Sequence, residues 1–138
     1  MKIKYDMSLM KYISIFETLT KASVKDCIQE HNSIIFIVAE NEIAKAIGRN
    51  GINVRKIEGA INKKVKIVEF SDNLLQFIRN LIMPIKPRDI MQQEGIVTIA
   101  GSDSSSKSLL IGRNGSNLRF YERIVSRYFK DVAEIKVI

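Results

Sequence analysis

The chain has 138 residues, of which 46% are hydrophobic and 27% charged, a composition typical of globular proteins. Lys and Arg number twenty-two against fifteen Asp and Glu, and the formal charge of +7 favours a polyanionic partner, with a basic solvated surface as the alternative. The single cysteine, Cys27, excludes an intramolecular disulfide. Neither a signal-peptide core nor a run long enough to span a membrane occurs, so we expect a cytoplasmic protein without membrane contact.

The first half of the chain begins with apolar residues at spacings of three and four from Asp6 to about Ala22, which predict an amphipathic helix. The next segment, SVKDCIQEHNS, resembles an edge strand, and Ile34–Val38 is typical of a strand buried on both faces. A short helix then ends at Gly48, a second helix follows Gly51, and a β-rich segment occupies residues 64–70.

The second half repeats this order. A helix over residues 74–81 stops before Pro84, PRDIMQQEG resembles the earlier edge strand, and residues 96–100 form a second central strand. Asp103 or a neighbouring serine caps a short helix that leads into Gly112, and a longer helix follows Gly115. In residues 133–138 apolar and charged side chains alternate, as in a strand with one solvent-exposed face.

These patterns predict an α+β protein of two tandem domains, residues 1–70 and 71–138. Each has the order helix–strand–strand–helix–helix–strand, with a small three-stranded sheet covered by helices. Only Ser71-Asp72, an expected helix N-cap, lies between the halves, so we expect them to be held in a fixed relative orientation. The aromatic residues with core-like spacing are Tyr12, Phe16, Phe36, Phe77 and Phe129.

The sequence IGRNG occurs twice, each time between two helix-like segments. Two glycines let a backbone approach a ligand closely, a helix N-terminus favours anions, and arginine provides a forked cation suited to phosphate. The simpler alternative is a helix C-cap followed by a tight turn. Exact repetition in the same context favours a sugar-phosphate site, composed of Ile47, Gly48, Arg49, Asn50 and Gly51 in the first half and Ile111, Gly112, Arg113, Asn114 and Gly115 in the second.

Further polar residues match between the halves without being required by packing. They are Asn53 with Asn117 and Arg55 with Arg119, and we expect this set to touch nucleic acid. Further candidate phosphate contacts are Lys45 and Lys56 in the first half and Lys107 and Arg123 in the second. An aliphatic floor for bases is expected from Ile43, Ala44 and Ile47 in the first half and from Leu110 and Ile111 in the second.

An Ile-Gly-x-x-Gly motif between short helices flanked by strands resembles the KH domain, whose GXXG loop holds about four nucleotides of a single strand. The early position of the extra helix and strand resembles the type II arrangement. A closely joined pair of such units resembles the archaeal NusA-like family of transcription factors. That resemblance implies single-stranded RNA, a nascent transcript or ribosomal RNA, as partner, with RNA polymerase or other transcription factors as further candidates, and a role in transcription termination or antitermination.

The two halves are not identical in this region. Sixteen positions separate Ile96 from Gly112, against fourteen from Ile34 to Gly48, and the serine-rich insert SDSSSK is expected to alter the rim of the groove there. Residues 102–108 are expected to form a polar cap and loop.

Three alternatives remain at this point: a ribosome-assembly or rRNA-binding KH protein, a structural adaptor and a phosphate-handling enzyme. No Lys-Ser/Thr follows the glycines as a P-loop requires. Cys27 and His31 lack further zinc ligands, and Asp26 and Asp89 read as surface or turn residues. We therefore expect no catalytic residues, no metal, no cofactor and no enzymatic activity.

Overall fold

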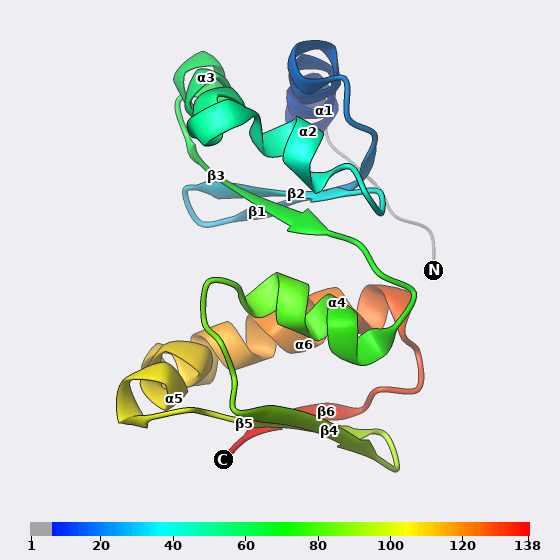
Figure 1. Cartoon of the computed structure of the whole chain (residues 1–138), viewed down its shortest axis with the longest axis vertical. Coiled ribbons are helices and arrows are strands. Elements are labelled where there is room, and N and C mark those ends of the chain that lie inside the picture. Colours follow the sequence, from blue (N-terminus) through cyan, green and yellow to red (C-terminus); the bar gives the residue numbers. More distant parts are fainter. Residues whose placement is uncertain (1–6) are drawn as a thin grey trace. The chain divides into compact units, whose positions relative to one another are not determined.

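The computed structural model describes residues 7–138, so the predicted helix start at Asp6 lies outside the described residues (Figure 1). The chain divides into two compact units, with the first ending at Ser71 and the second beginning at Asp72. Within the described residues, no helix combines the length and the apolar character needed to cross a membrane.

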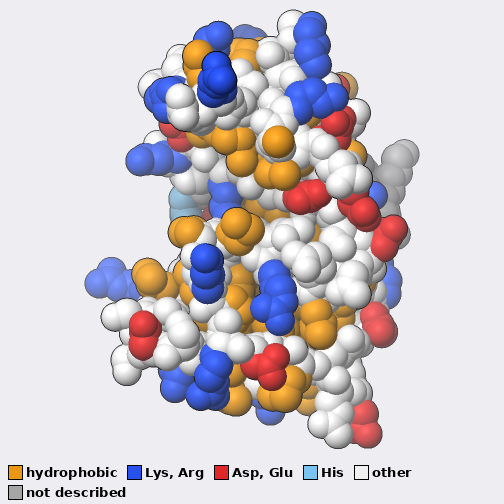
Figure 2. Space-filling model, in the orientation of Figure 1, with side chains coloured by type: hydrophobic (Ala, Val, Ile, Leu, Met, Phe, Trp, Pro, Cys, Tyr) orange, Lys and Arg blue, Asp and Glu red, His pale blue; other side chains and the backbone are white. Residues whose placement is uncertain are grey.

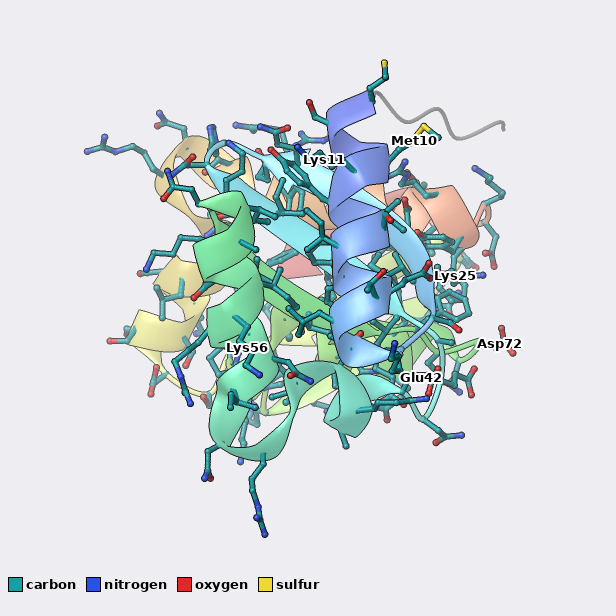
Figure 3. All side chains as sticks on the ribbon, turned by 90° about the horizontal axis from the view of Figure 1, so that it is seen from above. Met10, Lys11, Lys25, Glu42, Lys56 and Asp72 are labelled. Atoms are coloured by element: carbon teal, nitrogen blue, oxygen red, sulfur yellow. The ribbon has the colours of Figure 1, made fainter. Side chains whose placement is uncertain are left out.

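The first unit has the predicted order of elements. In chain order they are α1 (Met7–Thr20), β1 (Val24–Glu30), β2 (Ser33–Val38), α2 (Ile43–Ile47), a 3-10 turn η1 (Arg49–Gly51), α3 (Ile52–Ile61) and β3 (Lys64–Glu69). β2 is the central strand, antiparallel to β1 and parallel to β3. The helices lie over one face of the sheet, with α1 and α3 side by side (Figures 1 and 3).

The core of the first unit lies between this face and the helices. Phe16 of α1 stacks on Phe36 of β2 with ring centroids 4.2 Å apart, and both are fully buried. Ile34 and Val38 flank Phe36 on the same face because side chains alternate along a strand. Ile35 and Ile37 are buried as well, which confirms the prediction of a strand buried on both faces.

The second unit repeats the same element order and sheet topology. Its elements are α4 (Leu74–Ile82), β4 (Asp89–Gln93), β5 (Ile96–Ala100), α5 (Ser104–Ile111), η2 (Arg113–Gly115), α6 (Ser116–Tyr128) and β6 (Glu134–Val137). The central strand β5 is antiparallel to β4 and parallel to β6. Phe77 of α4 contacts Tyr128 edge-on with centroids 5.6 Å apart, and packs on Phe129 at 5.8 Å. The predicted α+β class is confirmed.

Three local predictions were wrong. The N-cap of α4 is Asn73, whose side chain accepts a hydrogen bond from the amide of Gln76 at 2.9 Å, and not Ser71-Asp72. Residues 104–108 form the beginning of α5 and not a loop, because the predicted Asp103 cap accepts from the Ser106 amide at 2.7 Å. Asp26 is fully buried, although Asp89 is exposed as expected.

Candidate nucleic-acid interface

The two IGRNG loops have the same backbone conformation. Gly48 has φ 77° and ψ 170°, and Gly112 has φ 74° and ψ 175°. Asn50 and Asn114 are left-handed at φ 54°, and the second glycine follows at φ 72° or 74°. The two loops therefore share one shape, each within its own unit.

The first glycine is required for two reasons. Its φ and ψ fall in a region that residues with a Cβ rarely adopt. A Cβ on Gly48 would also lie 2.8 Å from the Asn53 side chain, and one on Gly112 would lie 2.7 Å from that of Asn117. No other residue type fits this position without moving the asparagine.

The paired asparagines link the helices on either side of each loop. Asn53 Nδ2 donates to the carbonyl of Lys45 at 3.0 Å, and Asn117 Nδ2 donates to the carbonyl of Leu109 at 2.8 Å. These carbonyls belong to the last turn of α2 and α5, where helix carbonyls lack intrahelical partners. The amides predicted to touch nucleic acid therefore also stabilise the protein's own loop.

The paired arginines hold the loop from the other side. Arg55 Nη1 donates to the carbonyl of Asn50 at 2.7 Å, and Arg119 donates through Nη2 to the carbonyl of Asn114. Both arginines are exposed, and a guanidinium has five N–H groups. Each can therefore fix the loop and still present positive charge beside it.

The exposed end of each loop combines a cation with the positive end of a helix dipole. Arg49, Asn50, Arg113 and Asn114 are exposed. α3 and α6 begin directly after Gly51 and Gly115, and no side chain caps either helix. The amide of Ile52 donates to the carbonyl of Arg49, and that of Ser116 donates to the carbonyl of Arg113. The start of each helix still carries the positive end of its dipole beside an exposed arginine, so this end of the loop is suited to an anion.

The predicted lysines are placed differently in the two units. Lys45 forms an ion pair with Glu42 at 2.9 Å, and Glu42 also accepts from the amide of Ser23. The Lys45 contact, followed by the Ser23 amide, lowers the pKa of Glu42 below its usual value. Glu42 lies beside the end of α1 (Figure 3). The position equivalent to Lys45 is Leu109, whereas Lys107 lies two residues earlier and packs over Gly101.

The predicted aliphatic floor is partly wrong. Leu110 is fully buried in the core, as is Ala46 at the equivalent position of the first unit, so neither can contact a base. Leu109 is instead 59% exposed, and Ile111 is 36% exposed. In the first unit Ile47 is half-buried, and Ala44 is exposed.

A repeated glutamate was not found from the sequence. Glu58 Oε2 accepts from the amide of Val65 at 2.9 Å, and Glu122 Oε2 accepts from the amide of Ile135 at the same distance. Each glutamate lies ten positions after the first glycine, a match that could have indicated the role. The contact ties the helix after the loop to the edge strand, β3 or β6.

Charge is dispersed and not continuous on the face shown in Figure 2, where Lys and Arg side chains alternate with hydrophobic and acidic ones. The local geometry of the two loops is therefore more informative than the overall charge.

Over residues 7–138, no group of three or more His, Cys, Asp or Glu side chains could hold a metal ion.

A glycine-hinged loop between two short helices, beside a three-stranded sheet with one parallel pair, defines a KH-type unit. The sequence profile described as "KH domain" matches residues 11–81, just over half of the chain, and the chain belongs to this family. KH domains are RNA-binding modules and not enzymes, so the expectation that the chain is not an enzyme is confirmed by its family.

The chain is also similar to archaeal proteins over nearly its whole length. A "Probable transcription termination protein NusA" of Methanococcus vannielii is 32% identical over 100% of this chain and 81% of the relative. Its namesake in Halococcus morrhuae is 29% identical over 99% of each. The crystal structure of APE1850 superimposes with a TM-score of 0.73 at 27% identity, covering 97% of this chain and all of that one. The predicted resemblance to archaeal NusA-like proteins is thus confirmed at the level of the family.

Proposed function

We propose that the chain binds single-stranded RNA through two KH units, one in each half, each holding about four nucleotides at its IGRNG loop. The observation that carries this proposal is the identity of the two loops in backbone conformation and in their Asn and Arg contacts. The family profile ends at residue 81, so the assignment of a second KH unit rests on this geometric identity.

The chemistry follows from groups that the protein's own contacts leave available. A phosphate approaches the positive end of the α3 or α6 dipole, and Arg49 or Arg113 donates to its oxygens. Asn53, Arg55 and their counterparts keep the loop in its binding shape, so little conformational entropy is lost on binding. Bases lie against exposed aliphatic side chains beside the loop.

The names of the relatives support a role in transcription termination. Antitermination and action on nascent transcripts are included in the proposal from the resemblance to the NusA-like family. RNA polymerase or other transcription factors would be further partners, and the protein would act in the cytoplasm. Crosslinking in cells, followed by sequencing of the attached RNA, tests this assignment. Enrichment of nascent transcripts supports it, and enrichment of ribosomal RNA alone would favour a ribosome-assembly role instead.

RNA binding is tested by fluorescence anisotropy with a labelled single-stranded RNA of about ten nucleotides. The variant carries Arg49→Asp and Arg113→Asp, which place carboxylates where phosphates must lie. Loss of charge-assisted hydrogen bonds at both loops predicts a loss of affinity on the order of 100-fold. Binding to the wild type should weaken with salt, because neutralised phosphates release counterions.

A matched control removes the same amount of positive charge elsewhere. Lys11→Glu and Lys130→Glu change exposed residues outside the loops, and Lys11 lies near the start of α1, far along that helix from α2 (Figure 3). We expect this control to lose only a few-fold in affinity, as a general charge effect. If the folded loop variant binds as well as the control, the loop assignment is wrong.

A further inference from the structure

The second unit has a hollow of about 380 Å³ between α6 and the beginning of β6. Val132 and Ala133 contribute an apolar lining, and the charged side chains around it are Arg119, Arg123, Glu122 and Glu134. A volume of this order matches small-ligand pockets in proteins. The hollow adjoins the loop, because Arg119 both lines it and donates to the carbonyl of Asn114.

The equivalent place in the first unit has a different chemistry. A hollow of about 280 Å³ is lined there by Asn32, Glu58, Asn62, Lys63 and Lys64, without an apolar side chain. Two exchanges account for much of the contrast. Gly59 occupies the position of Arg123, and Lys64 occupies that of Glu134.

The hollow of the second unit presents both hydrogen-bond donors and acceptors. Two arginines and two glutamates carry no net charge together, which disfavours a phosphate. Glu122 uses Oε2 on the Ile135 amide and retains Oε1. Among residues 7–138, none forms a hydrogen bond or an ion pair with the carboxylate of half-buried Glu134. Arg123 lies over the ring of Phe120, 5.6 Å from its centroid. A flat, uncharged ligand with its own donors and acceptors fits this lining.

We propose that this hollow receives one unpaired base of the RNA strand held at the second loop, and that guanine is the base it selects. Guanine has two adjacent N–H groups, at N1 and N2, that a carboxylate can accept together. Its O6 and N7 form the acceptor pair that an arginine fork contacts bidentately. Adenine offers no pair of adjacent N–H donors from a ring nitrogen and an amino group, and the pyrimidines lack N7. This inference rests on the proposed RNA-binding function and adds base selectivity to one of its two sites.

The test measures anisotropy with eight-nucleotide RNAs of uridines that carry a single guanine at each position in turn. Adenine or inosine replaces it in matched strands, and inosine lacks only the N2 amino group. We expect the wild-type protein to bind the best-placed guanine strand about tenfold more tightly than its adenine counterpart, with inosine between them.

The principal variant is Glu134→Lys, which introduces the residue of the first unit at the equivalent position. It should remove the guanine preference without weakening the binding of oligouridine. Arg123→Ala is a second variant that reduces the preference from the other side of the hollow. Asp89→Lys is the matched control, since it makes the same charge change on the exposed edge strand β4 and should keep the preference.

Each outcome separates this inference from the function on which it rests. Loss of the preference in Glu134→Lys alone, with the control unchanged, supports the base site. RNA binding without base preference in the wild type, or a preference that survives both variants, overturns the base site and leaves the RNA-binding proposal standing. Absence of RNA binding in the folded wild-type protein overturns both.

Discussion

Replacement of Gly48 by alanine is the most direct perturbation of the first loop. The glycine has φ 77° and ψ 170°, and an added Cβ would lie 2.8 Å from both Cγ and Nδ2 of Asn53. That amide cannot move away freely, because it donates to the carbonyl of Lys45. Gly48→Ala must therefore strain the backbone or break the hydrogen bond that links α2 to α3.

The expected cost follows from these two effects. A residue with a Cβ in this region of φ and ψ costs about 1–3 kcal/mol. Displacement of the Asn53 amide costs a further 0.5–1.5 kcal/mol, roughly the net contribution of one hydrogen bond. Alanine recovers about 0.4–1 kcal/mol by restricting the unfolded chain. The free energy of unfolding should fall by about 2–3 kcal/mol.

Urea unfolding of the full chain, followed by far-ultraviolet circular dichroism, measures this change against two alanine controls. Gly51 also has a positive φ, but its added Cβ would meet only Arg55 Nη1 at an ordinary 3.5 Å, so Gly51→Ala should cost about 1–2 kcal/mol. Gly59 lies inside α3 with nothing within 4 Å of an added Cβ. Gly59→Ala should raise the free energy of unfolding by up to about 1 kcal/mol.

The reasoning is refuted if Gly48→Ala is no less stable than Gly51→Ala. The double variant Gly48→Ala/Asn53→Ala provides a second check, because removal of the amide relieves the close contact. Its cost should be smaller than the sum of the two single changes by at least 0.5 kcal/mol, the usual lower range of coupling between touching residues. Strict additivity would mean that Asn53 does not constrain Gly48.

Three further predictions concern single hydrogen bonds. Asn73→Ala removes the N-cap of α4 and should lower the free energy of unfolding by about 1 kcal/mol in urea titrations, whereas Asn73→Asp should preserve it. The Ser106 amide, which donates to Asp103, lowers the pKa of that carboxyl, so this cap stabilises α5 above the ordinary aspartate pKa and is lost as the pH falls through the lowered value. Thermal melts between pH 5 and 2 should therefore show a smaller acid effect in Asp103→Asn, which keeps the acceptor without titrating. Glu58→Ala leaves the part-buried amide of Val65 without its acceptor and should cost about 1–3 kcal/mol by the same urea assay, while Glu58→Gln should cost less.

The element order was predictable because hydrophobic periodicity and glycine positions act locally. A spacing of three and four residues predicts α1, and a continuous apolar run predicts β2, because both signals lie within the element itself. The Asp103 cap was predictable for the same reason, since a capping side chain bonds an amide three residues later in its own segment.

Side-chain direction was not predictable to the same degree. Asp26 is buried because the pairing of β1 with β2 shifts register between Val24 and Asp26, so that Asp26 and Cys27 are buried in succession. Such an irregularity interrupts the alternation on which strand predictions rely. Leu110 and Leu109 differ by one position, about 100° around a helix, and the sequence does not fix that rotation for a short element.

The roles of the matched asparagines and arginines explain why the repeat is so exact. Each loop needs a glycine that the asparagine amide can approach, and a carbonyl that the arginine can reach. These requirements hold whether or not RNA is bound, so identity of the loops alone implies equal shape and not equal binding. Differences between the two units must then come from positions outside the loop, such as Lys45 against Leu109 and Gly59 against Arg123. Exchange of these flanking residues between the units should therefore transfer binding preferences. The exchange does not change the loops, and the two loops have the same shape.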